Sequence, residues 1–193
     1  MDRADVRLVK LAYYYFGRHR GTGYWDEIAK LRRVFEQWQE LAKQYGVKVL
    51  YHTHSADEDG PNYMGSNAAG MMHFIRGLDP RHIGVYLDPA HLRFEGEQFD
   101  FAVAMAEGYL AAVALKDLEL KWDDKHYRVF RNMVFAGKGM VEWDLIMSEL
   151  ARIGYCGPLS VHAEYAAANA QEFEAQLPRE VAFFKAAYAR AQK

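Results

Sequence analysis

The stretch "WDLIMSELARIGYCGPLSVHAEY" (143–165) contains one complete helix, turn and strand. A helix is predicted over 143–153, and the glycines of "GYCGP" predict the turn that ends it. "LSVHAEY" (159–165) reads as a strand, and side chains two residues apart on a strand share a face. His162 and Glu164 are therefore expected side by side at the end of this strand.

The same alternation of strands and helices extends back to the N-terminus. Further strands are predicted at 6–16, 47–54, 82–88 and 111–120. Further helices are predicted at about 24–45, 66–78 and 99–110, and from 171 to the C-terminus. Strands that alternate with helices of this length predict a parallel α/β sheet. The polar segment 121–139 has room for a short hairpin, and no break in composition divides the chain, so a single domain over 1–193 is expected.

The composition excludes several classes of partner. The 24 basic and 26 acidic residues leave a net charge of −2, which gives no broad field for nucleic acid or an anionic membrane. Cys156 is the single cysteine, so no internal disulfide can form. No apolar run approaches the ~20 residues of a spanning helix, and the first residues lack the apolar core of a signal peptide. We therefore expect a cytoplasmic location without nucleic-acid or membrane partners.

Polar side chains collect at the ends of the predicted strands. These residues are His52 and His54 of "LYHTHS", Asp88 and His91 of "YLDPAH", Lys116 and Asp117 of "LKD", and His162 and Glu164 of "VHAEY". The carboxyl ends of parallel strands meet at one edge of a sheet, and ligands bind at that edge.

Imidazoles and carboxylates that converge from several strands suit a divalent cation. Such a donor set favours Zn²⁺, Mn²⁺ or Co²⁺ over Mg²⁺. Each residue alone has a structural explanation: a buried histidine is often simply hydrogen-bonded, and Asp88 before Pro89 fits an ordinary turn. Their common position at successive strand ends favours a metal site.

Four stretches resemble the xylose isomerase-like TIM-barrel superfamily. They are "GVKVLYHTHS", "IGVYLDPAH", "VALKD" and "GKGMVEWDLIMSELARIGYCGPLSVHAEY", in the family's order and over nearly the whole chain. This superfamily holds sugar and sugar-phosphate isomerases and epimerases, inosose dehydratases, and DNA repair enzymes of the endonuclease IV type. The resemblance implies a partial (βα)8 TIM barrel, with about five parallel βα units that match the C-terminal strands of the barrel.

The resemblance also implies the metal ligands. The family's Asp and final Glu match Asp88 and Glu164, and its histidine three residues after the Asp matches His91. The family's first Glu falls on His52, where a histidine ligand can stand in. The family histidine of the next strand falls on Ala114, which has no donor atom.

Catalytic and substrate-binding roles follow from the same match. Glu164, or a carboxylate opposite it, would act as the base, and His54 or His162 would move protons between substrate oxygens. Lys116 lies on the face of Ala114 and would supply a fixed positive charge. His91, His162 and Lys116 would contact the substrate.

The leading functional hypothesis is a divalent-metal-assisted isomerase or epimerase that acts on a sugar, a sugar phosphate or a related polyol. Because His52 replaces one carboxylate of the family's epimerase pair, an inosose dehydratase-like lyase is the nearest alternative. A non-catalytic barrel remnant that binds sugar or partner chains is a second alternative. An endonuclease of the DNA repair type fits poorly with the net charge of −2 and the missing ligands.

The number of predicted strands also bears on assembly. A full barrel has eight βα units and about 250 residues, and five parallel strands leave both edges of a sheet open. The chain could be a fragment, a truncated product, or a subunit that completes its sheet against another chain. Of these, we expect a partial barrel that forms a homo-oligomer.

Overall fold

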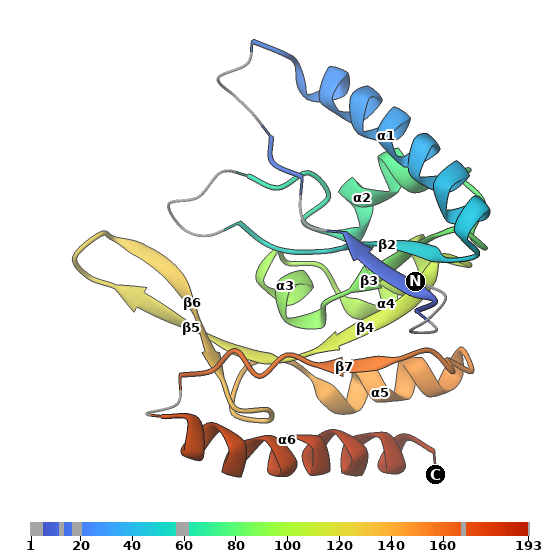
Figure 1. The fold of residues 1–193 in the computed structure, drawn as a ribbon. Coiled ribbons are helices and arrows are strands. Elements are labelled where there is room, and N and C mark those ends of the chain that lie inside the picture. Colours follow the sequence, from blue (N-terminus) through green and yellow to red (C-terminus); the bar gives the residue numbers. More distant parts are fainter. Residues whose placement is uncertain (1–5, 12–13, 17–20, 57–61, 167–168, 193) are drawn as a thin grey trace. The chain divides into compact units, whose positions relative to one another are not determined.

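The computed structural model describes residues 6–11, 14–16, 21–56, 62–166 and 169–192. Strands and helices alternate along most of the chain (Figure 1). The strands are β1 (Leu8–Leu11), β2 (Lys48–His52), β3 (Ile83–Leu87), β4 (Leu110–Leu115), β5 (Asp117–Asp123), β6 (Arg128–Val134) and β7 (Leu159–Val161). The helices are α1 (Tyr24–Tyr45), α2 (Ala68–Ile75), α3 (Pro89–Phe94), α4 (Phe99–Met105), α5 (Trp143–Arg152) and α6 (Ala170–Ala191). None of these described helices combines the length and hydropathy needed to cross a membrane.

Five of the strands form one sheet in the order β1-β2-β3-β4-β7. β2 pairs in parallel with both β1 and β3, and β4 pairs in parallel with β7. Strands that follow one another in the chain lie next to one another in this sheet, with helices in the connections, as in a βα barrel. The predicted fold class, a partial (βα)8 TIM barrel, is confirmed.

The chain divides into two compact units, 1–112 and 113–193. In the first unit every residue of β3 is buried, which is typical of a parallel strand covered on both faces. Gly84 of this strand has no room for a side chain. A Cβ there would lie 2.8 Å from Cδ2 of Leu50 and 2.9 Å from Cβ of Ala111. Glycine at this position therefore lets the neighbouring strands pack closely.

Helix α1 has the bounds that the sequence predicts. Gly46 follows it with a φ of 62° and donates its N–H to carbonyls of the last turn, a common way for a helix to end. The buried face of α1 includes Phe35, whose ring centroid lies 5.7 Å from that of Tyr51 and 5.5 Å from that of Phe74. These three rings form the centre of the first unit's core.

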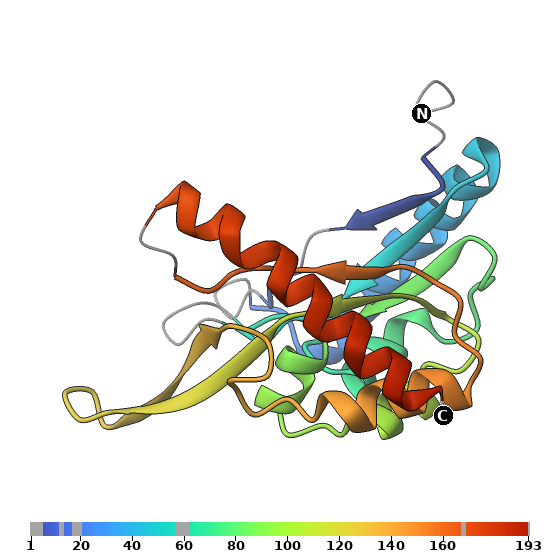
Figure 2. The ribbon, with the colours of Figure 1, turned by 90° about the horizontal axis from the view of Figure 1, so that it is seen from below.

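The second unit contains the predicted hairpin. β5 and β6 pair in antiparallel register from Asp117 opposite Val134 to Asp123 opposite Arg128, as a sheet separate from the five-stranded one (Figure 1). Helices α5 and α6 pack side by side (Figure 2). The ring centroids of Trp143 and Phe184 lie 4.7 Å apart at this contact.

Several sequence predictions need correction. The strand predicted over 159–165 is only Leu159–Val161, so His162 and Glu164 follow β7, and the helix predicted over 99–110 ends at Met105. The strand predicted over 111–120 ends at Leu115, because the pairing partner changes there: β4 pairs with β7, whereas β5 begins at Asp117 and pairs with β6. The strand predicted over 6–16 is shorter, since β1 is Leu8–Leu11; residues 12 and 13 lie outside the described part of the chain. Helix α3 was not predicted at all.

Candidate functional site

The predicted site residues fall into both units. His52, His54, Asp88 and His91 belong to the first unit, and Lys116, His162 and Glu164 belong to the second. Within each unit the structure brings these residues together.

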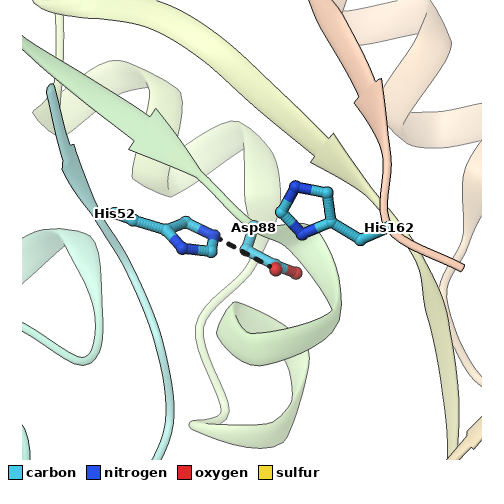
Figure 3. Close-up of side chains that lie close together, drawn as sticks. All are labelled: His52, Asp88 and His162. Carbon is cyan, nitrogen blue, oxygen red and sulfur yellow. Dashed lines mark hydrogen bonds and ion pairs between the residues drawn. The ribbon is translucent and has the colours of Figure 1, made fainter. Parts of the chain in front are cut away.

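Asp88 is the central residue of the first group. It is the N-cap of α3, and its Oδ1 accepts hydrogen bonds from the backbone N–H groups of Ala90 at 3.1 Å and His91 at 3.3 Å. Its Oδ2 lies 3.3 Å from Nε2 of His52 (Figure 3) and 3.7 Å from Nε2 of His91. One carboxylate oxygen therefore caps the helix, while the other faces two imidazoles.

The two histidines of the "LYHTHS" stretch lie near each other, although β2 ends at His52 and His54 follows the strand. The ring centroids of His52 and His54 are 5.9 Å apart. His52 ends β2 and stacks on Tyr86 at a centroid distance of 4.6 Å; the two residues are partners in the strand register. The ring of His54 lies 3.7 Å, between centroids, from that of His91.

The first group offers donor atoms of the kind that divalent cations bind. Oδ2 of Asp88 and the Nε2 atoms of His52 and His91 come from side chains that are at most 1% exposed. Nitrogen donors with one carboxylate oxygen are ligands that Zn²⁺, Mn²⁺ and Co²⁺ accept. Because the Asp88 carboxylate is buried, its attraction to a bound cation would be stronger than in water.

The second group is built around Glu164. Nζ of Lys116 lies 3.0 Å from Oε2 of Glu164, and Nδ1 of His162 lies 3.6 Å from Oε1. The Lys116 side chain is 2% exposed and that of Glu164 is 45% exposed, so a buried ammonium holds a carboxylate that solvent reaches. Ala114, at the position of the family's histidine, is buried in β4.

Asp117 was noted in the sequence beside Lys116, but its role was not predicted. Its carboxylate accepts hydrogen bonds from the backbone N–H groups of Leu118, Gly137, Gly139 and Val141 and from the indole N–H of Trp143. The side chain is 1% exposed. Asp117 therefore fixes the loop that follows the hairpin, directly beside Lys116 in the chain.

Sequence reasoning also missed Thr53 and Ser55. Oγ1 of Thr53 accepts the backbone N–H of Asp88 at 2.9 Å, and Oγ of Ser55 lies 2.7 Å from Nδ1 of His91. Both hydroxyl residues stand inside the "LYHTHS" stretch. Their alternation with the two histidines at the end of an apolar strand is the signal that could have identified them.

We expect Glu180 of α6 to make the stability of the second unit depend on pH. Its side chain is buried, and Oε1 accepts the backbone N–H of Ala136 at 3.3 Å. Burial is the main cause that raises the pKa of this carboxyl above its usual value, and the charge of Asp117 adds to the rise. Tyr165, whose own pKa is raised mainly by burial, faces the same carboxyl.

A raised pKa means that the folded protein holds the Glu180 proton more tightly than the unfolded chain does. The resulting contribution to the free energy of unfolding is fully present below the ordinary pKa of 4.5 and is lost as the pH rises through the folded-state pKa. We expect the free energy of unfolding to fall less with rising pH in Glu180→Gln, because an amide oxygen can still accept the Ala136 N–H without a charge. Urea unfolding at a series of pH values measures this dependence. Glu174→Gln, at an exposed position of the same helix, is the control and should leave the slope unchanged.

Comparison with known proteins identifies the family. The family model described as "Xylose isomerase-like TIM barrel" matches residues 3–187, and the chain belongs to this family. An inosose dehydratase of Lacticaseibacillus casei is 24% identical over 161 residues, which cover 77% of this chain and 51% of that protein. The chain thus spans about half the length of the curated relatives it matches.

Solved structures agree with the fold. A xylose isomerase domain protein from Alicyclobacillus acidocaldarius superposes with a TM-score of 0.72 at 18% identity, over 100% of this chain and 67% of that one. A D-psicose 3-epimerase, crystallised in the presence of D-fructose, superposes with a TM-score of 0.71 at 15% identity, over 95% of this chain and 65% of that one. The resemblance expected from the sequence is confirmed.

Proposed function

We propose that the protein is a divalent-metal-assisted isomerase or epimerase that acts on a sugar, a sugar phosphate or a related polyol. The observation that carries this proposal is the ion pair between Lys116 and Glu164, with Nζ and Oε2 3.0 Å apart. A carboxylate that solvent reaches, held by a buried ammonium, can take a proton from a carbon beside a carbonyl and return it. Membership of a family whose solved relatives include sugar epimerases supports the substrate class.

We propose His52, Asp88, His91 and Glu164 as the metal ligands, the set that the family resemblance implies. The parallel order of the sheet supports this set, because the residues follow the C-terminal ends of β2, β3 and β7. A bound Mn²⁺, Zn²⁺ or Co²⁺ would polarise a substrate carbonyl and orient the neighbouring hydroxyl.

The remaining roles belong to the chain's own side chains. Glu164 acts as the base that takes the proton, and the Lys116 ammonium offsets the negative charge that develops on the substrate oxygen. His54 or His162 moves a proton between adjacent oxygens. His91, His162 and Lys116 contact the hydroxyl groups of the substrate.

A second candidate is an inosose dehydratase-like lyase. Curated relatives carry the name inosose dehydratase, which favours it, and the family resemblance places His52 where epimerases have a carboxylate. In that reaction one base takes the proton beside a ketone, and an acid expels the hydroxyl from the next carbon. Both candidates share the first proton transfer and differ in the product.

One experiment tests both candidates. The protein loaded with Mn²⁺, Zn²⁺ or Co²⁺ is incubated in D₂O with ketohexoses, their phosphates and inososes. Deuterium at the carbon beside the carbonyl, followed by NMR, reports the shared proton transfer. An isomerised or epimerised product supports the leading proposal, and a dehydrated product supports the lyase. No exchange with any substrate in any metal form would overturn both.

We expect Lys116→Met to lower kcat by about 100-fold, the loss typical of one charge-stabilising group, while cation binding remains. The reason is that methionine keeps the length of the side chain and removes its charge. The control is Lys121→Met in the exposed hairpin, which should keep wild-type kcat. Equal kcat for the Lys116→Met and wild-type proteins would show that Lys116 takes no part in the reaction.

The homo-oligomer, the cytoplasmic location and the single-domain organisation stay predictions.

A further inference from the structure

Each of the four residues 52–55 contacts either Asp88 or His91. His52 reaches Oδ2 of Asp88 with Nε2 at 3.3 Å, and Thr53 accepts the backbone N–H of Asp88 at 2.9 Å. The ring of His54 lies against that of His91, and Oγ of Ser55 lies 2.7 Å from Nδ1 of His91. The two hydroxyl contacts thus alternate with the two histidine contacts.

The hydroxyl contacts are in the protein interior. Thr53, Ser55 and His91 are all 0% exposed. A hydrogen bond in such surroundings is electrostatically stronger than in water, and its loss leaves a buried polar group without that partner. The bond between Ser55 and His91 therefore restricts the rotation of a ring whose other nitrogen, Nε2, lies 3.7 Å from Oδ2 of Asp88.

We propose that Ser55 is a positioning residue: its hydroxyl holds Nδ1 of His91 and thereby turns Nε2 toward Asp88 and the cation. This inference rests on the proposed function, since it assumes that a cation binds beside Asp88. A histidine that binds a metal through one nitrogen usually donates its other N–H to an outer partner, which fixes the ring orientation. Oγ of Ser55 can accept such an N–H, because a hydroxyl accepts as well as donates.

A purely structural role for Ser55 makes a different prediction. In that case the hydroxyl only satisfies a buried nitrogen, and its loss would weaken folding without changing cation affinity. Affinity for the metal alone and the orientation of the His91 ring separate the two roles, whereas a stability measurement by itself does not.

The test compares Ser55→Ala with the wild-type protein. Equilibrium dialysis measures Mn²⁺ and Zn²⁺ affinity in the absence of any sugar, and we expect about 10-fold weaker binding, within the range known for loss of an outer partner. Ser55→Thr keeps the hydroxyl and should restore the affinity. Ser66→Ala is the matched control, because its hydroxyl bonds to Glu95 on the protein surface, and it should bind as the wild type does.

A second measurement reads the His91 ring directly, at one pH and without metal. The NOE signal between the rings of His91 and His54, whose centroids lie 3.7 Å apart, should weaken in Ser55→Ala because the released His91 ring turns away; loss of the hydrogen bond without rotation would leave this His91 signal unchanged. Unchanged affinity together with an unchanged His91 signal would overturn the inference. If the wild-type protein takes up no cation, the proposed metal function fails, and the His91 signal alone then decides whether Ser55 positions the ring. The comparison of Ser55→Ala with the wild-type protein remains decisive even if Ser55→Thr does not fold.

Discussion

Asp88→Asn should greatly weaken divalent-cation binding while leaving the protein folded. An asparagine oxygen can replace Oδ1 as the cap of α3, and asparagine is as good an N-cap as aspartate. The amide removes the negative charge that Oδ2 presents to His52 and His91. Because loss of an outer partner already costs 10- to 100-fold in metal affinity, we expect the loss of this charge to weaken binding by more than about 100-fold.

Calorimetric titration with Mn²⁺ and Zn²⁺ measures the affinity, and thermal unfolding measures the fold. Asp88→Ala separates the two roles of the residue, because it removes the cap as well and should cost about 1 kcal/mol of stability. Asp100→Asn, at the exposed start of α4, is the matched control and should bind the cation as the wild type does. Wild-type affinity in Asp88→Asn would exclude Asp88 as a ligand.

Asp117→Ala should lower the free energy of unfolding by at least about 3 kcal/mol. The substitution removes the acceptor of four backbone N–H groups and of the Trp143 indole. Bonds to a charged acceptor are each worth about 1.5–3 kcal/mol, and buried donors left without one are costly. Loss of Asp117 should therefore loosen the loop over 137–141.

Urea unfolding followed by circular dichroism measures this loss. Asp124→Ala in the exposed turn of the hairpin is the control, and we expect it to change stability by no more than about 0.5 kcal/mol. A loss below about 1 kcal/mol for Asp117→Ala would show that other acceptors replace its carboxylate.

Periodicity was sufficient to predict most of the fold. The helix over 24–45 and the five strands of the sheet follow from hydrophobic patterns and glycine turns, which are local signals. The break after Leu115 was not predicted, because the sequence pattern predicts one strand over 111–120 and the change of pairing partner is a tertiary effect. Helix α3 did have a local signal, since Asp88 before Pro89 is a common cap and first residue of a helix.

Two-residue alternation on a strand led us to expect His52 near His54 and His162 near Glu164. Both pairs do lie close, but β2 ends at His52 and β7 ends at Val161, so His54, His162 and Glu164 lie beyond the strands and strand alternation is not the cause. The proximity of Lys116 to Glu164 depends on how β4 pairs with β7, and the sequence carries only the general expectation that strand ends meet. Asp117 bonds to the loop over 137–141 and Ser55 to His91 in α3, so both join residues far apart in the sequence, and no spacing rule predicts these partners.

The close packing at Gly84 matters for how accurately the chain must fold. The β2–β3 register places Leu50 opposite Gly84 and His52 opposite Tyr86. A slip of one residue between these strands would send His52 to the other face of the sheet, although every helix and strand would still be present. A larger residue at position 84 would push against Leu50 and favour such a slip. Misfolded molecules of this kind would have a native-looking circular dichroism spectrum without the His52–Asp88 contact.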